Sequence, residues 1–444
     1  MIFLLVPYAA ALALVGLELA GRLSTRAVRL PTLPVRFWTI GLVASYALDL
    51  ALLRYAALHE FPMPAWRAAM PIPVLFLGVE HADAICAIHL AIAGAQTLAL
   101  VALYRLRPSR AEIAWPLAAL LALSVAAPVL GSFDLYGYVH DALLGFAGYA
   151  PTAAPLPGAY HLIDLWFQTP RAVIYGPLWI PIVRMMTAAG GTLLAKLIAY
   201  RLCSAGVFLA VLALLRSLAP RRALVVAALD PALHFQYVAN AHNDVIAIAI
   251  VLAAAALVRR NALAAFALIA VAGLLKLPYA VLALPVVASV RPAARRYAGC
   301  AAALAATAFV TWIGAGIAYV HAIAGYTHAL ELDLAHALPF AAALAAIAVA
   351  VAGGRRLRTA VWLMPVFGAF RLPLIFPWYA IFALPYALAR HDVLRYLLVS
   401  FPFATAVLTP ELMRPWTLLL VIPACVLLSL RRPPLAPALS TTAP

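Results

Sequence analysis

Two aspartates and a tyrosine with helical spacing stand in the longest segment between two apolar runs, residues 131–176. Asp134, Tyr138 and Asp141 are four and three residues apart, so a helix would place them on one face. Ser132 precedes them and is suited to cap such a helix. A carboxylate held in one position can act as a general base toward an attacking hydroxyl. The alternative is a solvated carboxylate without a chemical role, and the spacing alone leaves it open.

A second polar group, Asn-Ala-His-Asn-Asp at residues 240–244, separates two apolar runs. Its histidine, amide and carboxylate side chains could line a binding site. The alternative is a polar turn in which Asp244 caps the next helix. The dipeptide Asp230-Pro231 in the preceding run is typical of a kink.

Four cations stand apart from the other basic residues, near the ends of apolar runs: Arg171, Lys276, Arg371 and Arg414. Lys276 is followed by Leu277-Pro278, and the residue before a proline is disfavoured in a helix, so the helix should break there. A cation at such a break suits a phosphate at the level of the lipid headgroups. A snorkelling side chain or a structural ion pair is the alternative for each of them.

The composition decides what kind of element must position these residues. The chain has 444 residues, of which 67% are apolar and 10% are charged. A soluble protein is about half apolar and about a quarter charged, so a cytosolic enzyme, a nucleic-acid-binding domain and a disordered protein are excluded. A span needs about 20 residues. We therefore expect an all-α, polytopic integral membrane bundle with about 13–15 spans.

The arginines indicate how this bundle is oriented. They fall in tight groups between apolar runs, which the positive-inside rule places in the cytoplasm. These groups are Arg22/26/29/36, Arg105/107/110, Arg216/221/222, Arg259/260, Arg291/295/296, Arg355/356/358, Arg390/395 and Arg431/432. The loops between them hold most of the acidic residues, so the N-terminus should lie outside and the C-terminus inside. The net charge of +16 then faces anionic inner-leaflet lipids rather than nucleic acid.

We accordingly expect one transmembrane domain over residues 1–430, with 131–176 as an extracytoplasmic catalytic loop. Residues 431–444 are rich in Pro and Ala and should form a disordered cytoplasmic tail. No basic residue precedes Arg22, which favours a retained N-terminal span over a cleaved signal peptide.

No metal site and no cofactor are predicted. The four cysteines lie in apolar runs without ligand spacing and are expected to be buried hydrophobic residues. Several histidines and acids share one loop: His321, His328, Glu331, Asp333 and His336. They could form a weak metal site, but a polar loop is the favoured interpretation.

Five short motifs occur in an order that is familiar from one enzyme family. They are Ser132-Phe133-Asp134-Leu135-Tyr136-Gly137-Tyr138, Tyr175-Gly176-Pro177, His242-Asn243-Asp244, Lys276-Leu277-Pro278 and Pro377-Trp378-Tyr379. Because it has these motifs in this order, the chain resembles the polyprenol-phosphate-mannose-dependent alpha-(1→6)-mannosyltransferases of the GT-C superfamily. The resemblance extends from about residue 130 to residue 390.

The resemblance implies a GT-C fold, a polyprenyl-phosphate donor that carries mannose, and Asp134 as the catalytic residue. The other motif positions are expected to line the substrates: Tyr136, Tyr138, Asp141, Tyr175, His242, Asn243, Asp244, Trp378 and Tyr379. Cations would stabilise the departing donor phosphate, and the candidates are Lys276, Arg371 and Arg171. The expected partners are a lipid-linked sugar donor, a glycan or glycolipid acceptor and membrane lipids. The expected reaction inverts the anomeric configuration, at the outer side of the bacterial inner membrane.

The competing interpretation is a transporter or lipid flippase, which would need polar residues through the middle of the bilayer. Only a few charges lie inside apolar runs: Asp49, Arg54, Arg201 and Asp230. A structural scaffold without catalysis is a third possibility. Most of the polar residues lie on one face, which favours the enzyme over both.

Overall fold

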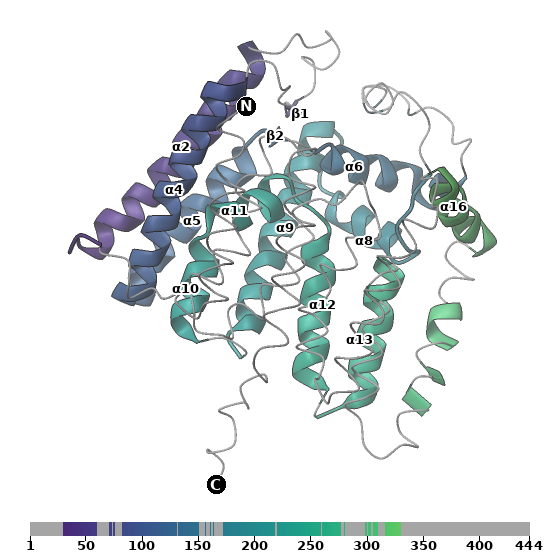
Figure 1. Cartoon of the computed structure of the whole chain (residues 1–444). Helices are drawn as coiled ribbons and strands as arrows, with labels where there is room; N and C mark the ends of the chain where they lie inside the picture. The colour runs from purple at the N-terminus through teal and green to yellow at the C-terminus, as the bar shows by residue number, and fades with distance from the viewer. Residues whose placement is uncertain are drawn as a thin grey trace.

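The structure is a computed structural model (Figure 1). It describes residues 30–59, 71–72, 74–75, 82–130, 132–150, 156, 160, 163, 172–217, 220–258, 260–276, 279, 298–299, 301–302, 305–309 and 316–329.

Long apolar runs form long helices in this chain, because a helix satisfies its own backbone hydrogen bonds where water is absent. The longest are α2 (Val35–His59), α4 (Ala82–Leu106) and α9 (Leu193–Leu215). Each contains a segment long and apolar enough to cross a membrane, of 21, 20 and 23 residues respectively. At 1.5 Å per residue these lengths match the roughly 30 Å hydrocarbon core. The expected all-α membrane bundle is therefore confirmed.

The part of the chain that the structure describes holds three such helices, or four if a bent pair is counted as one span. The total of about 13–15 spans stays a prediction, as does the domain division at residue 430, which lies outside the described residues. The described strands are one short parallel pair, β1 (Val74–Leu75) and β2 (Val129–Leu130), in the register Val74 with Val129.

Helices α5 (Arg110–Ala126) and α10 (Arg221–Leu229) pack between the long helices. A capping box starts α5, in which the Glu112 N–H donates to Ser109 Oγ and the Ser109 N–H donates to Glu112 Oε2. Arg221 donates to the carbonyl of Pro108 and so joins the start of α10 to the turn before α5.

The polypeptide bends sharply after α10. Asp230 accepts a hydrogen bond from the Ala232 N–H and starts the short helix α11 (Pro231–His234), so the predicted kink is confirmed. A π-helical turn, η4 (Phe235–Ala239), follows, and α12 (Asp244–Leu257) then leaves at 108° to the Pro231–Ala239 segment. Helix α13 (Ala262–Leu275) returns beside α12.

Shorter helices gather at the end of the bundle where α12 begins and α13 ends (Figure 1). They are α6 (Asp134–Leu144), the 3-10 helix η2 (Gly145–Tyr149) and α8 (Trp179–Met186). Helix α16 (Gly316–Ala329) contacts η2 from the side. This end of the bundle brings together the polar motifs that are far apart in the sequence.

Candidate active site

Helix α6 carries the aspartate that the sequence singled out. It begins at Asp134, one residue later than a Ser132 cap would give, because Phe133 occupies the cap position. Ser132 still contributes, since its Oγ accepts the Asp134 N–H at 3.2 Å. The helix stops at Gly145, whose φ of 62° suits glycine. Arg184 donates from Nε to the Ala142 carbonyl at 3.0 Å and fixes this end against α8.

A hollow opens along one face of α6. Asp134, Tyr138 and Asp141 all line it, so the predicted shared face is confirmed. The extended residues 172–175 form the opposite wall. The hollow therefore presents two carboxylates and aromatic rings to whatever enters it.

Two side chains hold one oxygen of the Asp134 carboxylate. His242 Nδ1 lies 3.1 Å from Asp134 Oδ2, and the Tyr138 hydroxyl donates to the same atom at 3.4 Å. Burial raises the pKa of Tyr138 well above its ordinary value, and Tyr175 and the Asp134 charge act in the same direction, so the hydroxyl keeps its proton. The Asp134 side chain is 24% exposed, whereas that of His242 is fully buried. Asp134 thus faces the hollow and His242 stands behind it.

The bend between η4 and α12 places His242 next to Asp134. Its N–H donates to the Gln236 carbonyl, and Ala241 before it has a φ of 54°, in the left-handed region that favours glycine. The next residue, Asn243, donates its backbone N–H to the Tyr138 hydroxyl at 3.2 Å. The His-Asn pair therefore contacts Asp134 both directly and through Tyr138.

Asp244 has a different partner from the one that a capping role would give it. Helix α12 starts at Asp244 itself, and Asn243 holds the cap position without a side-chain cap bond, so the capping alternative is wrong. Lys276 Nζ lies 2.7 Å from Asp244 Oδ1, and Tyr279 donates to the same oxygen at 3.3 Å. The ammonium group of Lys276 also lies 5.8 Å from the centre of the Tyr175 ring, which lines the hollow.

The Tyr175-Gly176-Pro177 turn explains how Tyr175 reaches Lys276. The Gly176 N–H donates to the Leu275 carbonyl at 3.0 Å, so the turn satisfies the last carbonyls of α13. A Cβ atom on Gly176 would lie 1.8 Å from the Leu274 carbonyl oxygen. Only glycine allows this approach, so the turn can lie in contact with the C-terminal end of α13.

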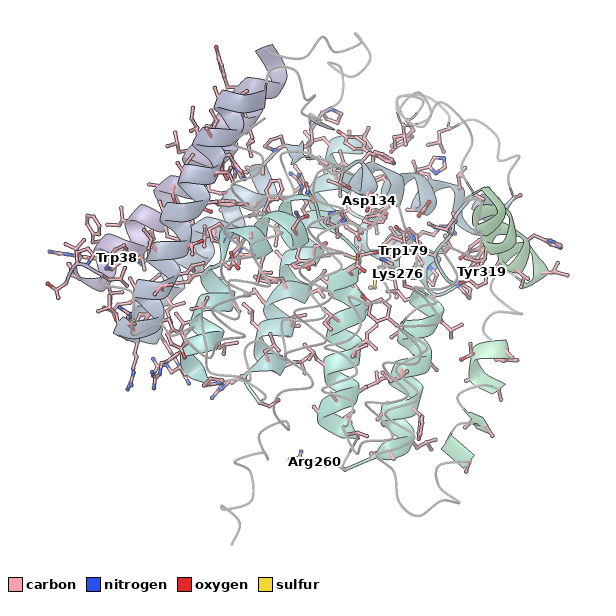
Figure 2. The ribbon with its side chains drawn as sticks, in the orientation of Figure 1. Trp38, Asp134, Trp179, Arg260, Lys276 and Tyr319 are labelled. Carbon is pink, nitrogen blue, oxygen red and sulfur yellow. The ribbon has the colours of Figure 1, made fainter. Side chains whose placement is uncertain are left out.

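Asp141 and an aromatic cluster complete the site. Trp179 Nε1 donates to Asp141 Oδ2 at 2.9 Å. The Tyr138 ring packs against the rings of Trp179, Tyr200 and Tyr175 at centroid distances of 4.9, 5.3 and 5.8 Å. Figure 2 shows Asp134, Trp179 and Lys276 at the same end of the bundle, with Arg260 at the other end of the α12–α13 pair.

A family model described as the N-terminal domain of alpha-(1->6)-mannopyranosyltransferases matches residues 38–293, more than half of the chain. The chain belongs to this mannosyltransferase family. The matched segment contains Asp134, Tyr175, residues 242–244 and Lys276. No curated protein and no solved structure matched the chain. The family supports mannosyl transfer by a membrane glycosyltransferase that acts on a sugar donor and a glycan acceptor.

This mannosyltransferase brings most of the predicted site residues together, and Tyr136 is the clear exception. The Tyr136 hydroxyl is fully buried, donates to the Ile72 carbonyl at 2.5 Å and accepts the Ile72 N–H at 3.1 Å. It anchors the segment around β1 and does not line the hollow. Four other predicted site residues lie outside the described residues: Arg171, Arg371, Trp378 and Tyr379.

Three polar or aromatic residues of the site were not predicted from the sequence: His140, which lines the hollow, Trp179 and Tyr200. Trp179 stands two residues after Pro177 of the motif Tyr175-Gly176-Pro177, and a buried indole N–H needs an acceptor. Trp179 could therefore have been included in the predicted site. Tyr200 lies inside an apolar helix with no local motif around it. Only its packing against Tyr138 places it in the cluster.

Charges within apolar helices have structural partners in the mannosyltransferase. Asp49 of α2 lies 2.6 Å from His89 Nδ1 of α4, and both side chains are buried. Arg201 of α9 donates to the Val125 and Ala127 carbonyls at the end of α5. Arg54 is exposed. Asp49 and Arg201 thus join helices to one another.

In the described ranges, no group of three His, Cys, Asp or Glu side chains has the arrangement of a metal site. Glu331, Asp333 and His336, which the sequence grouped as a weak metal site, lie outside those ranges.

Proposed function

We propose that this protein transfers a mannosyl group from a polyprenyl-phosphate donor to a hydroxyl of a glycan or glycolipid acceptor. The observation that carries the proposal is the Asp134 carboxylate, which faces the hollow while Lys276 lies behind Tyr175 on the opposite wall. A base in the hollow and a cation next to the ring that lines its opposite wall are the groups that such a displacement requires.

Asp134 acts as the general base. It takes the proton of the acceptor hydroxyl while the hydroxyl oxygen attacks the anomeric carbon. Two hydrogen bonds to Oδ2 favour the ionised carboxylate, which is the form that can accept this proton. The new C–O bond forms as the bond between the anomeric carbon and the phosphate oxygen breaks. A single displacement of this kind inverts the anomeric configuration.

Lys276 acts on the other side of the reaction. The departing polyprenyl phosphate gains negative charge, and the ammonium group near Tyr175 stabilises it. Asp244 holds Lys276 in place at 2.7 Å. The tyrosine and tryptophan rings around the hollow suit the apolar faces of a sugar, and Asp141 suits its hydroxyl groups.

The position of the site in the bundle fits a lipid-linked substrate. The hollow lies at the end of the α12–α13 pair opposite Arg260 (Figure 2). Because arginine-rich loops stay in the cytoplasm, this end faces the outside of the bacterial inner membrane. A polyprenyl chain remains in the bilayer, so the sugar that it carries reaches a site at headgroup height without leaving the membrane.

The decisive experiment compares Asp134→Asn with the wild-type protein in proteoliposomes that contain polyprenyl-phosphate-[14C]mannose and a mannan-type acceptor. Asp134→Asn should reduce transfer by about 1,000-fold or more while the protein stays folded and monodisperse. Asp49→Asn is the control at a carboxylate that does not line the hollow and pairs with His89. Undiminished transfer by folded Asp134→Asn would refute the assignment. A wild-type protein that uses a nucleotide-linked mannose instead would refute the donor class.

A further inference from the structure

His242 reaches Asp134 across 108 residues of sequence, and its side chain has no exposed surface. It was expected to touch substrate, yet it is not among the residues that line the hollow. Its Nδ1 instead lies 3.1 Å from the oxygen of Asp134 that also receives the Tyr138 hydroxyl. His242 therefore contacts Asp134 and does not border the hollow that a sugar would fill.

The chain adopts unusual backbone conformations to bring His242 there. A π-helical turn precedes it, Ala241 adopts a positive φ, and the chain bends by 108° between the flanking helices. π-helical turns and left-handed non-glycine residues are found mostly where function requires them. Asn243 adds a second link, because its N–H holds the Tyr138 hydroxyl that donates to Asp134.

We propose that His242 is a positioning residue for Asp134, which rests on the proposed function of Asp134 as the general base. An ionised carboxylate has only acceptor atoms, so Nδ1 carries the proton in this pair. The Nδ1–H donor fixes the orientation of the carboxylate toward the hollow. His242 itself touches neither the donor nor the acceptor.

A positioning role predicts a specific kinetic pattern. His242→Leu should lower kcat by roughly 10- to 100-fold, the effect expected when a charged group loses one hydrogen bond. The KM values for donor and acceptor should change by less than about twofold, because neither substrate loses a contact. His242→Asn should recover most of kcat, since its amide nitrogen can take the place of Nδ1. His242→Gln should recover less, because its amide lies nearer the place of Nε2.

A second buried pair in the same protein provides the matched control. His89 Nδ1 lies 2.6 Å from Asp49 Oδ1 between α2 and α4, and neither residue lines the hollow. His89→Leu breaks the same kind of contact, so it should lower thermal stability and leave kcat per folded molecule unchanged. An equal loss of kcat in His89→Leu and His242→Leu would overturn the positioning role.

Two further results separate this inference from the proposed function. If folded His242→Leu keeps kcat within twofold while Asp134→Asn is inactive, His242 does not position the base and the proposed function stands. If Asp134→Asn is active, the proposed function itself fails. If His242→Leu does not fold, the comparison of His242→Asn with His242→Gln decides, and equal activity of these two variants overturns the role of Nδ1.

Discussion

Lys276 Nζ and Asp244 Oδ1 form a 2.7 Å ion pair between the end of α13 and the start of α12. The Asp244 side chain is 1% exposed and the Lys276 side chain 15% exposed, so the carboxylate is sealed and the ammonium group is nearer to solvent. An ammonium group has three donors. A carboxylate and a substrate phosphate can therefore share it, which makes the pair part of the proposed donor site as well as of the fold.

Exchanging the two charges should separate these roles. Breaking a buried pair by Lys276→Ala or Asp244→Asn alone should destabilise the protein by about 3–5 kcal/mol. The double variant Asp244→Lys with Lys276→Asp should regain stability but not transfer, because the cation is no longer beside Tyr175. Thermal unfolding and the donor KM measure the two effects. Restored transfer in the double variant would show that the pair serves the fold alone.

The approach of Gly176 to α13 should tolerate no side chain. Gly176→Ala would place a methyl group 1.8 Å from the Leu274 carbonyl oxygen, and the turn that carries Tyr175 must then move. A displacement of about 1 Å in a catalytic site can cost about 100-fold in rate. Gly206→Ala on α9 is the control, because its methyl group meets nothing within 4 Å. Transfer assays on both variants test the prediction, and equal activity would contradict it.

Tyr136 should matter for stability and not for transfer. Tyr136→Phe leaves the Ile72 N–H and carbonyl without their partner, which should cost about 1–3 kcal/mol of unfolding free energy. The kcat of the folded enzyme should stay unchanged. Tyr138→Phe should lower transfer as well as stability, because it removes a donor from Asp134 and leaves the buried Asn243 N–H without its acceptor. A fall in transfer by Tyr136→Phe at unchanged thermal stability would place its hydroxyl on substrate instead.

The Trp179 indole should support Asp141 through one hydrogen bond. Trp179→Phe keeps an aromatic ring but removes the N–H that lies 2.9 Å from Asp141 Oδ2. We expect roughly a tenfold fall in kcat/KM, mainly through KM, since hydrogen bonds to charged groups contribute about 1.5–3 kcal/mol. Trp115→Phe on the exposed surface of α5 is the matched control. An unchanged KM for both substrates would remove Asp141 from the binding site.

Sidedness can be measured directly with two single cysteines in a background that lacks the four native ones. Ala147 of η2 precedes Gly148, whose carbonyl accepts the N–H of Val173 in the wall of the hollow. Arg260 lies at the opposite end of the bundle, and both residues are exposed. Ala147→Cys should react with a membrane-impermeant maleimide added to intact spheroplasts. Arg260→Cys should react only after the membrane is permeabilised. The reverse labelling would place the hollow in the cytoplasm and contradict a lipid-linked donor at the outer face.

Several features followed from local rules. The apolar runs determined a helical membrane bundle, the spacing of Asp134, Tyr138 and Asp141 determined their shared face, and Asp230-Pro231 determined a kink. Each of these depends on one continuous stretch of the chain, where sequence distance fixes spatial distance.

The partners of the charged groups could not be obtained in this way. From the sequence, Asp244, His242 and Tyr136 were all expected to line the substrates, with a helix cap as the alternative for Asp244. Their actual neighbours lie 32, 108 and 64 residues away along the chain. Only the packing of α6, α12 and α13, with the bend at η4, brings these atoms within hydrogen-bonding distance. The sequence alone therefore determined which groups can do chemistry, and the tertiary structure decided which of them act on one another, because hydrogen bonds and ion pairs depend on distances in space that local spacing does not encode.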